Sequence, residues 1–253
     1  MNIETTLLNG VAVIAIARPE KKNAMTAAMY AAMADALLAA NADPLVRAVL
    51  ISGQPGIFCA GNDIEDFLAD PPNVPSAPLF KFMHALSGCE KPVVAAVTGS
   101  AIGIGATMLL HCDLVYIAED ARLALPFVSL AIVPECASSL LLPRLMGHVK
   151  AAEKLLLGLA FTAQEAVELN MANAVLPESQ VLSHASRVAE RFNALPPDAV
   201  RETKRLMRRN SAADVKSAIV AEGEALSERL ASPEAKQAFS AFLQRRQPDR
   251  SSP

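Results

Sequence analysis

The 253-residue sequence has few features of a metal, disulfide-bonded or nucleic-acid-binding protein. Its four cysteines show no C-x-x-C spacing, which argues against a zinc site and, in a chain of this size, against a disulfide framework. We therefore expect a reducing compartment, the cytoplasm. The net charge of −3 gives no general attraction to nucleic acid or to anionic membranes. We expect no nucleic acid, membrane or metal ion as a partner.

We expect no targeting signal in the two terminal segments of this sequence. The N-terminal segment has an early Glu4 and no basic stretch, so it reads as strand, turn and strand rather than as a signal peptide. The C-terminal Ser-Ser-Pro is not a peroxisomal signal. The 21 residues from Pro92 to Cys112 carry no formal charge, but a proline, three glycines and several hydroxyl groups interrupt them, which disfavours a membrane span.

That uncharged stretch contains the chemical centre that we predict. It reads as a buried strand (92–97), a turn with Gly99, Gly103 and Gly105, and a helix that begins near Ile104. Glycines allow the backbone to approach a ligand closely, and the first N–H groups of a helix are free to donate. Such a turn can hold an oxyanion. The third glycine of a Rossmann turn is missing, while plain tight packing of strand on helix stays open.

The remaining pattern alternates strands and helices, which predicts an α/β or α+β fold. Asn9-Gly10 predicts a hairpin between 3–8 and 11–17, and Thr26 can cap a following helix. Further strands are expected at 48–51, 114–118, 122–125 and 174–176, and further helices at 64–68, 79–87, 148–157 and 163–170, with one more entered near residue 138. From about Glu178 the pattern is only helical. We expect a core of residues 1–195 and a helical region of residues 196–253.

Five short motifs, in their order along the chain, resemble the crotonase, or enoyl-CoA hydratase/isomerase, family. They are Lys22-Asn-Ala24, Phe58-Cys-Ala-Gly-Asn-Asp-Ile64, Lys91-Pro-Val-Val-Ala-Ala-Val-Thr-Gly99, Gly103-Ile-Gly105 and Cys112-Asp113. The resemblance covers nearly the whole chain. It implies a spiral of ββα repeats with a C-terminal helical trimerisation region, a homotrimer or hexamer, and an acyl-CoA substrate that carries its own coenzyme A, without a separate cofactor.

The resemblance also implies the residues of the site. Backbone N–H groups of Asn62 and Ile104 match the two donors of an oxyanion hole for the thioester carbonyl. Residues matched to the acyl-CoA are Lys22, Ala24, Ala60, Asp63, Ile64, Gly103, Thr107, Phe127, Phe242 and Arg245. Phe242 and Arg245 would contact the nucleotide, often from a neighbouring subunit.

The reaction depends on which carboxylates are present. Hydratases of this family use two glutamates, and the matching positions here are Thr107 and Phe127, which cannot exchange a proton near neutral pH. The segment from Pro126 to Ser139 instead resembles the Δ3,Δ2-enoyl-CoA isomerase branch, in which the residue matched by Glu135 is the base. One carboxylate suffices for an allylic shift. A hydratase that uses Glu135 and a water, and an acyl-CoA-binding subunit without turnover, are the alternatives.

Structural roles compete with chemical ones at several acidic and basic positions. Glu135 could cap a helix or form a subunit contact, and neighbouring effects on its pKa oppose one another. Asp63 and Asp66 stand where capping is expected, and Asp113 is expected to be a structural hydrogen-bonding acid. The helix near 198–210 has a local charge of +3, which indicates a solvated face or, less often, a phosphate contact.

Overall fold

The computed structural model describes residues 2–69, 71–72 and 76–246, without the side chains of the last two. Two sheets form its centre. The larger has six strands in the order β1-β2-β3-β5-β7-β10, and the smaller has four in the order β4-β6-β8-β9. The α/β fold class predicted from the sequence is confirmed.

The larger sheet is antiparallel at one edge and parallel elsewhere. Its strands are β1 (Ile3–Leu8), β2 (Val11–Ile16), β3 (Ala48–Ser52), β5 (Val93–Val97), β7 (Leu114–Ala118) and β10 (Ala174–Leu176). The predicted hairpin is confirmed, since Leu8 pairs with Val11 across Asn9-Gly10. β3 and β5 are buried at every residue, because parallel central strands are covered on both faces and need no polar alternation.

The smaller sheet arises because each of three successive repeats contributes one strand to the larger sheet and one strand to the smaller sheet. Its strands are β4 (Ile57–Cys59), β6 (Ser100–Ile102), β8 (Arg122–Ala124) and β9 (Phe161–Thr162). In the chain, β4 directly follows β3, β6 follows β5, and β8 follows β7. A helix or a 3-10 turn comes after each pair. This is the spiral of ββα repeats that the family resemblance implied. It aligns the turns after β4 and β6 side by side.

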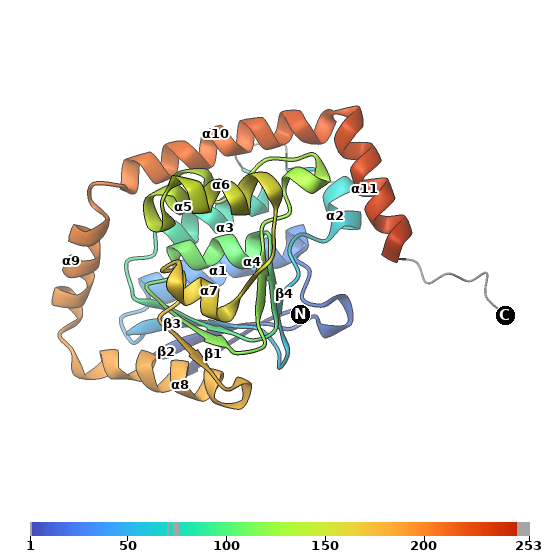
Figure 1. Ribbon diagram of the computed structural model, residues 1–253. Coiled ribbons are helices and arrows are strands. Elements are labelled where there is room, and N and C mark those ends of the chain that lie inside the picture. The colour runs from blue at the N-terminus through green and yellow to red at the C-terminus, as the bar shows by residue number, and fades with distance from the viewer. Residues whose placement is uncertain (1, 70, 73–75, 247–253) are drawn as a thin grey trace.

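Helices cover both faces of the larger sheet (Figure 1). α8 (Glu178–Glu190) lies on one face against β3, β5 and β7, and α1 (Ala27–Ala42) and α3 (Pro78–Ser87) pack together on the other side. The predicted cap of α1 is confirmed, because the side chain of Thr26 accepts a hydrogen bond from the N–H of Met29. The remaining core elements are α2 (Ile64–Ala69), α4 (Ile104–Thr107), α5 (Ser138–Met146), α6 (His148–Leu157), α7 (Ala163–Glu168) and the 3-10 turns at Pro19–Lys21, Met108–His111, Val128–Leu130 and Arg191–Ala194.

Three C-terminal helices form an arc around this body (Figure 1). They are α9 (Pro197–Arg208), α10 (Ala212–Ala231) and α11 (Pro233–Arg246). α10 packs on α3 and α5, and α11 packs on the 3-10 turn at Val128–Leu130. The basic residues of α9 mostly meet acids: Lys204 and Arg208 bind Asp113, at 2.6 and 3.0 Å. The structural role predicted for Asp113 is confirmed, and the domain division at residue 195 stays a prediction.

Three short strands, β4, β6 and β9, were not predicted; β4 and β6 lie inside segments that read as glycine-rich loops, and β9 has only two residues. The uncharged stretch from Pro92 to Cys112 folds as β5, β6, α4 and a 3-10 turn, so it is not one continuous span. Among the described residues, no helix is both long and apolar enough to cross a membrane.

Candidate active site

The first predicted oxyanion donor, the N–H of Asn62, lies in the turn between β4 and α2. Met25 forms a parallel bridge with Asn62: the N–H of Met25 donates to the oxygen of Gly61 at 2.8 Å, and its own oxygen accepts from the N–H of Asp63 at 2.9 Å. In a parallel bridge the residue between the two bonded neighbours points its own N–H to the opposite side. The N–H of Asn62 is therefore directed away from Met25.

The second predicted donor, the N–H of Ile104, begins the short helix α4. No carbonyl inside a helix can accept from its first N–H groups, so the Ile104 amide is free to bind an oxyanion. Gly103 precedes it with φ of 54° and ψ of −119°, a conformation that only glycine adopts without strain. A Cβ on Gly105 would lie 2.6 Å from the oxygen of Cys59, so the helix packs directly on the end of β4.

The two glycine turns are in contact with each other. A Cβ on Gly61 would lie 3.2 Å from the oxygen of Ile102, and one on Gly103 would lie 4.0 Å from the Cα of Gly61. The sequence predicted both turns but gave no measure of their separation. Side-by-side pairing of β4 with β6 brings them together, because each turn follows one of these strands.

A cavity of about 120 Å³ opens beside the two turns. Its walls combine backbone of the turns with apolar side chains. The residues predicted at the acyl-CoA that line it are Ala60, Ile64, Gly103, Phe127 and Phe242, together with Asn62. Phe67, Leu130, Ile132 and Phe239 complete the apolar lining. Phe239 and Phe242 come from α11 of the same chain, so the C-terminal helix forms one wall of its own subunit's cavity.

Glu135 is a buried acid next to this cavity, with 3 % of its surface exposed. Burial raises the pKa of Glu135 to about 8, a hydrogen bond from the Asn62 side chain lowers it in part, and the charge of Glu222 raises it further. The sequence left open whether burial or a nearby helix N-terminus would dominate the pKa of Glu135, and in the structure burial dominates. Oε1 of Glu135 has no hydrogen-bond partner among the described residues. Glu135 does not itself line the cavity but is joined to it through Asn62.

Tyr30 orients the Asn62 side chain and was not predicted as a site residue. Its hydroxyl donates to Oδ1 of Asn62, which leaves the amide nitrogen of Asn62 to face Glu135. Burial raises the pKa of Tyr30 well above its usual value, so the hydroxyl keeps its proton. The two partners lie 32 residues apart in the sequence, so only the fold reveals the contact.

Thr107 and Phe127 are the residues that the family resemblance matches to the two glutamates of hydratases. Thr107 is fully buried in α4; its hydroxyl faces the thiol of Cys136 and has no nitrogen or oxygen partner in the described part of the chain. Phe127 is buried at the cavity wall, with a ring carbon 3.9 Å from where a Cβ on Gly103 would lie.

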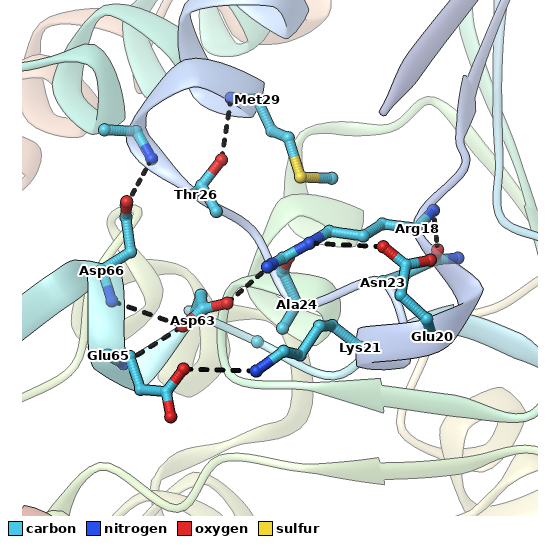
Figure 2. A network of polar contacts seen from close by, with 12 residues as sticks. Arg18, Glu20, Lys21, Asn23, Ala24, Thr26, Met29, Asp63, Glu65 and Asp66 are labelled. Atoms are coloured by element: carbon cyan, nitrogen blue, oxygen red, sulfur yellow. Dashed lines mark hydrogen bonds and ion pairs between the residues drawn. The ribbon is translucent and has the colours of Figure 1, made fainter. Parts of the chain in front are cut away.

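The loops predicted to hold coenzyme A are fastened to each other (Figure 2). The oxygen of Lys22 accepts from the N–H of Ala60 at 3.1 Å, while Lys22 itself is exposed. Arg18 donates both to the oxygen of Ala24, at 2.9 Å, and to Asp63, at 2.6 Å. Asn23 adds bonds to Ile57 and Phe58 of β4. These contacts give the backbone of Lys22, Ala24 and Ala60 a fixed place relative to β4.

Asp63 serves the structure through its side chain. Burial raises its pKa, but the hydrogen bond from Arg18 and those from the backbone of Asp66 and Glu65 outweigh burial, and the net pKa is lowered. Its Oδ1 accepts from the N–H groups that open α2, so the capping role expected from the sequence is confirmed. Asp66 in turn accepts from the N–H of Ala27 at the start of α1, at 2.7 Å.

The remaining predicted contact, Arg245, belongs to the last turn of α11, and its side chain lies outside the described residues. Within the described ranges, no group of three or more His, Cys, Asp or Glu side chains is placed to hold a metal ion.

Comparison with known proteins agrees with this geometry. A sequence model described as "Enoyl-CoA hydratase/isomerase" matches residues 6–252. The chain is 33 % identical over 250 residues to "Enoyl-CoA delta isomerase 2" of Rattus norvegicus, which covers 96 % of this chain but 64 % of the rat protein, less than two thirds of its length. It is 30 % identical to the "Probable enoyl-CoA hydratase" of Bacillus subtilis, over 94 % of each chain.

Among solved structures, that of OdaA from Pseudomonas aeruginosa superposes with a TM-score of 0.94 at 49 % identity, over 96 % of this chain and 98 % of the other. The match to the family model extends over almost every residue that builds the two sheets, both glycine turns and the helical tail. The chain therefore belongs to the enoyl-CoA hydratase/isomerase, or crotonase, family.

Proposed function

We propose that this protein is an enoyl-CoA isomerase, which moves the double bond of a 3-enoyl-CoA to the 2-position. The observation that carries the proposal is the buried carboxyl of Glu135, with a pKa near 8, beside two neighbouring turns that each direct one backbone N–H group, of Asn62 or of Ile104, away from the chain's own acceptors. Thr107 and Phe127 occupy the positions of the two hydratase glutamates, which favours a reaction that needs one acid only.

The reaction needs no atom beyond those of the substrate. The carboxylate of Glu135 removes a proton from C2, and the electrons of that C–H bond delocalise to the thioester oxygen as a dienolate. The N–H groups of Asn62 and Ile104 stabilise the negative oxygen, a contribution of roughly 10²–10³ in rate for each such donor. Glu135 then returns the proton to C4, the thioester carbonyl reforms, and the double bond lies between C2 and C3.

A pKa near 8 suits a group that must first accept and then donate the same proton. A carboxylate with an ordinary pKa would be a weak base toward C2, whereas a pKa close to the working pH balances the strength of the base against that of its conjugate acid. Oε1 of Glu135 supports this role, since no described residue engages it and it is free to take the proton. The second oxygen would keep its contact with the Asn62 side chain.

The acyl group would enter the cavity beside the two turns. Its volume of about 120 Å³ is below the roughly 300–1,000 Å³ of typical ligand sites, so the acyl chain must displace part of the wall. Phe242 on α11, near the end of the chain, belongs to that wall. Coenzyme A would lie along the loops of Lys22–Ala24 and Ala60–Ile64, with Phe242 and Arg245 toward the nucleotide.

The test compares wild type with Glu135→Gln on a 3-enoyl-CoA, followed by conjugation absorbance and product mass. We expect the wild type to form a 2-enoyl-CoA of unchanged mass and the variant to lose roughly 10²–10⁴ in rate. Glu119→Gln, at an exposed acid after β7, is the matched control and should keep full activity. A variant as active as the wild type would refute Glu135 as the base.

Hydration of a 2-enoyl-CoA is the second candidate, favoured by one observation. The buried hydroxyl of Thr107 faces only the thiol of Cys136, without a nitrogen or oxygen partner among the described residues, and could hold a water molecule. Relatives carry both isomerase and hydratase names. Addition of water would place OH on C3 and H on C2, so a product one water heavier would identify the hydratase. Binding of acyl-CoA without either product would instead identify a binding subunit without turnover.

We also propose that the protein assembles as a homotrimer or hexamer in the cytoplasm. Large apolar side chains on one surface support the assembly: Val149, Leu156 and Leu157 of α6 are 79 %, 66 % and 68 % exposed. Such a patch is usually covered by a partner. Light scattering on the purified protein tests it, and a monomer would refute it.

A further inference from the structure

Glu222 is a buried carboxylate on α10 that the proposed reaction does not use. Only 8 % of its surface is exposed, although it stands midway along a helix of the C-terminal arc. α10 packs there on α5, the helix that follows the segment carrying Glu135. Neighbouring Glu224, two residues further along α10, is exposed. An acid is seldom buried without hydrogen-bond partners or an opposite charge, so the burial of Glu222 requires a structural reason.

The partners of Glu222 are all hydrogen-bond donors from one short segment. Its Oε2 accepts from the N–H of Ala137 at 2.6 Å, and its Oε1 accepts from the N–H of Ser139 at 2.9 Å and from the hydroxyl of Ser139 at 2.5 Å. A carboxylate accepts at both oxygens, whereas a glutamine side chain would place an NH₂ donor against one of these donors. The site therefore fits a carboxylate and not an amide.

The backbone of that segment requires restraint. Cys136 and Ala137 are consecutive non-glycine residues in the left-handed region, with φ of 62° and 57°. Side chains with a Cβ disfavour this region, so the turn persists only where its surroundings hold it. Ala137 is also the residue before α5 and has no side chain to cap it. Glu222 supplies the missing acceptor from another helix, because the first N–H groups of α5 have no partner within it.

This turn immediately follows Glu135. The oxygen of Glu135 accepts from the N–H of Ser138 at 3.1 Å and from the hydroxyl of Ser138 at 2.6 Å. The backbone of Glu135 is thereby tied to the residue between the two that Glu222 binds. Any change in the turn would rotate the Glu135 side chain relative to Asn62 and the oxyanion donors.

We propose that Glu222 is a positioning residue for the reaction: its carboxylate fixes the left-handed turn at residues 136–139 and so holds the Glu135 side chain beside Asn62. This inference rests on the proposed function, because positioning matters only where Glu135 is the base. It joins the C-terminal helical arc to the chemistry of the core through three hydrogen bonds.

The test measures the turn and the reaction separately in Glu222→Gln, with Glu224→Gln as the matched control on the same helix. Amide hydrogen exchange reports on the N–H groups of Ala137 and Ser139, and steady-state kinetics report kcat and KM. In Glu222→Gln we expect faster exchange at both amides and a kcat lower by about 10- to 100-fold, the size that a displacement near 1 Å produces. KM should stay within about twofold, because the cavity wall is untouched. The control should match the wild type in all three.

Any other result refutes either the positioning role of Glu222 or the proposed function on which that role rests. Unchanged exchange, or faster exchange with wild-type kcat, would overturn it. If Glu222→Gln does not fold, Ser139→Ala removes one donor only and should lower kcat by a few fold with a smaller rise in exchange at residue 137; wild-type kcat in that variant would equally overturn it. A wild type inert toward both 3-enoyl- and 2-enoyl-CoA would refute the proposed function, and the exchange data would then show separately whether Glu222 holds the turn.

Discussion

Replacing Glu135 by glutamine should make the folded protein more stable than the wild type, by a difference that grows as pH rises. The same substitution should remove most of the activity. Burial raises the pKa of Glu135 to about 8, against 4.5 for an ordinary glutamate. Between these values the folded state keeps a proton that the unfolded state has released. The free energy of unfolding contributed by this group is therefore fully present below pH 4.5 and is lost as pH rises toward 8. Glutamine has a similar shape and does not titrate.

The magnitude follows from the two pKa values. Each pH unit between them costs the wild type about 1.4 kcal/mol, so the advantage of Glu135→Gln should grow by about 4 kcal/mol from pH 5 to pH 9. That is a large part of the roughly 5–15 kcal/mol by which proteins are stable. Other groups titrate over the same range, but they are shared by both proteins and cancel in the difference.

The assay is urea unfolding followed by circular dichroism at each pH from 5 to 9. Wild type, Glu135→Gln and the exposed control Glu119→Gln are compared, each with its own m-value. We expect the difference between the first two to rise steadily to pH 8 and then level, while the control stays parallel to the wild type. A difference that stays within about 1 kcal/mol across the range would show that Glu135 is not held neutral by burial, and the pKa argument would fail.

Three further predictions test the site. With a 3-enoyl-CoA, kcat/KM should rise about tenfold per pH unit and level near pH 8, since only the ionised Glu135 can take the proton; a profile flat from pH 6 would contradict this. Tyr30→Phe removes the hydroxyl that orients Asn62 and should lower kcat roughly tenfold with a shift of only a few degrees in melting temperature, whereas unchanged kcat would exclude an orienting role. Gly105→Ala would place a Cβ 2.6 Å from the oxygen of Cys59 and should cost about 1–3 kcal/mol in urea unfolding, and wild-type stability would refute that close packing.

Much of the fold could be predicted because its signals are local. Asn9-Gly10 specifies a tight hairpin turn, and Thr26 caps α1 within three residues of itself. β4 and β6 escaped prediction for the opposite reason. Each has three residues inside a glycine-rich segment, and it is a strand only because the other lies beside it. Pairing of this kind depends on the whole spiral, which no window of sequence contains.

The residues of the candidate site likewise fall into those with a local signal in the sequence and those that only the fold brings together. The two glycine turns that precede helices are visible in the sequence, and the family resemblance then matches Asn62 and Ile104 to backbone donors. Tyr30 could not be proposed, since its hydroxyl meets Asn62, 32 residues away, only in the fold. Glu222 stands in a helix with Glu224 and Glu228, and nothing local in the sequence distinguishes it from them. Packing of α10 on α5 alone distinguishes the buried one.

If Glu135 is the base, as we propose, the helical tail takes part in the chemistry. A base that works near pH 8 has to be desolvated, and a desolvated acid stays in place only where the surrounding structure holds it. Part of that structure comes from beyond residue 195: Phe239 and Phe242 form a wall of the cavity, and Glu222 braces the turn after Glu135. A core of residues 1–195 would expose this acid to water and would release its turn. The boundary predicted from the change in sequence pattern thus separates two parts of one site, because the acid and its restraint lie on opposite sides of it.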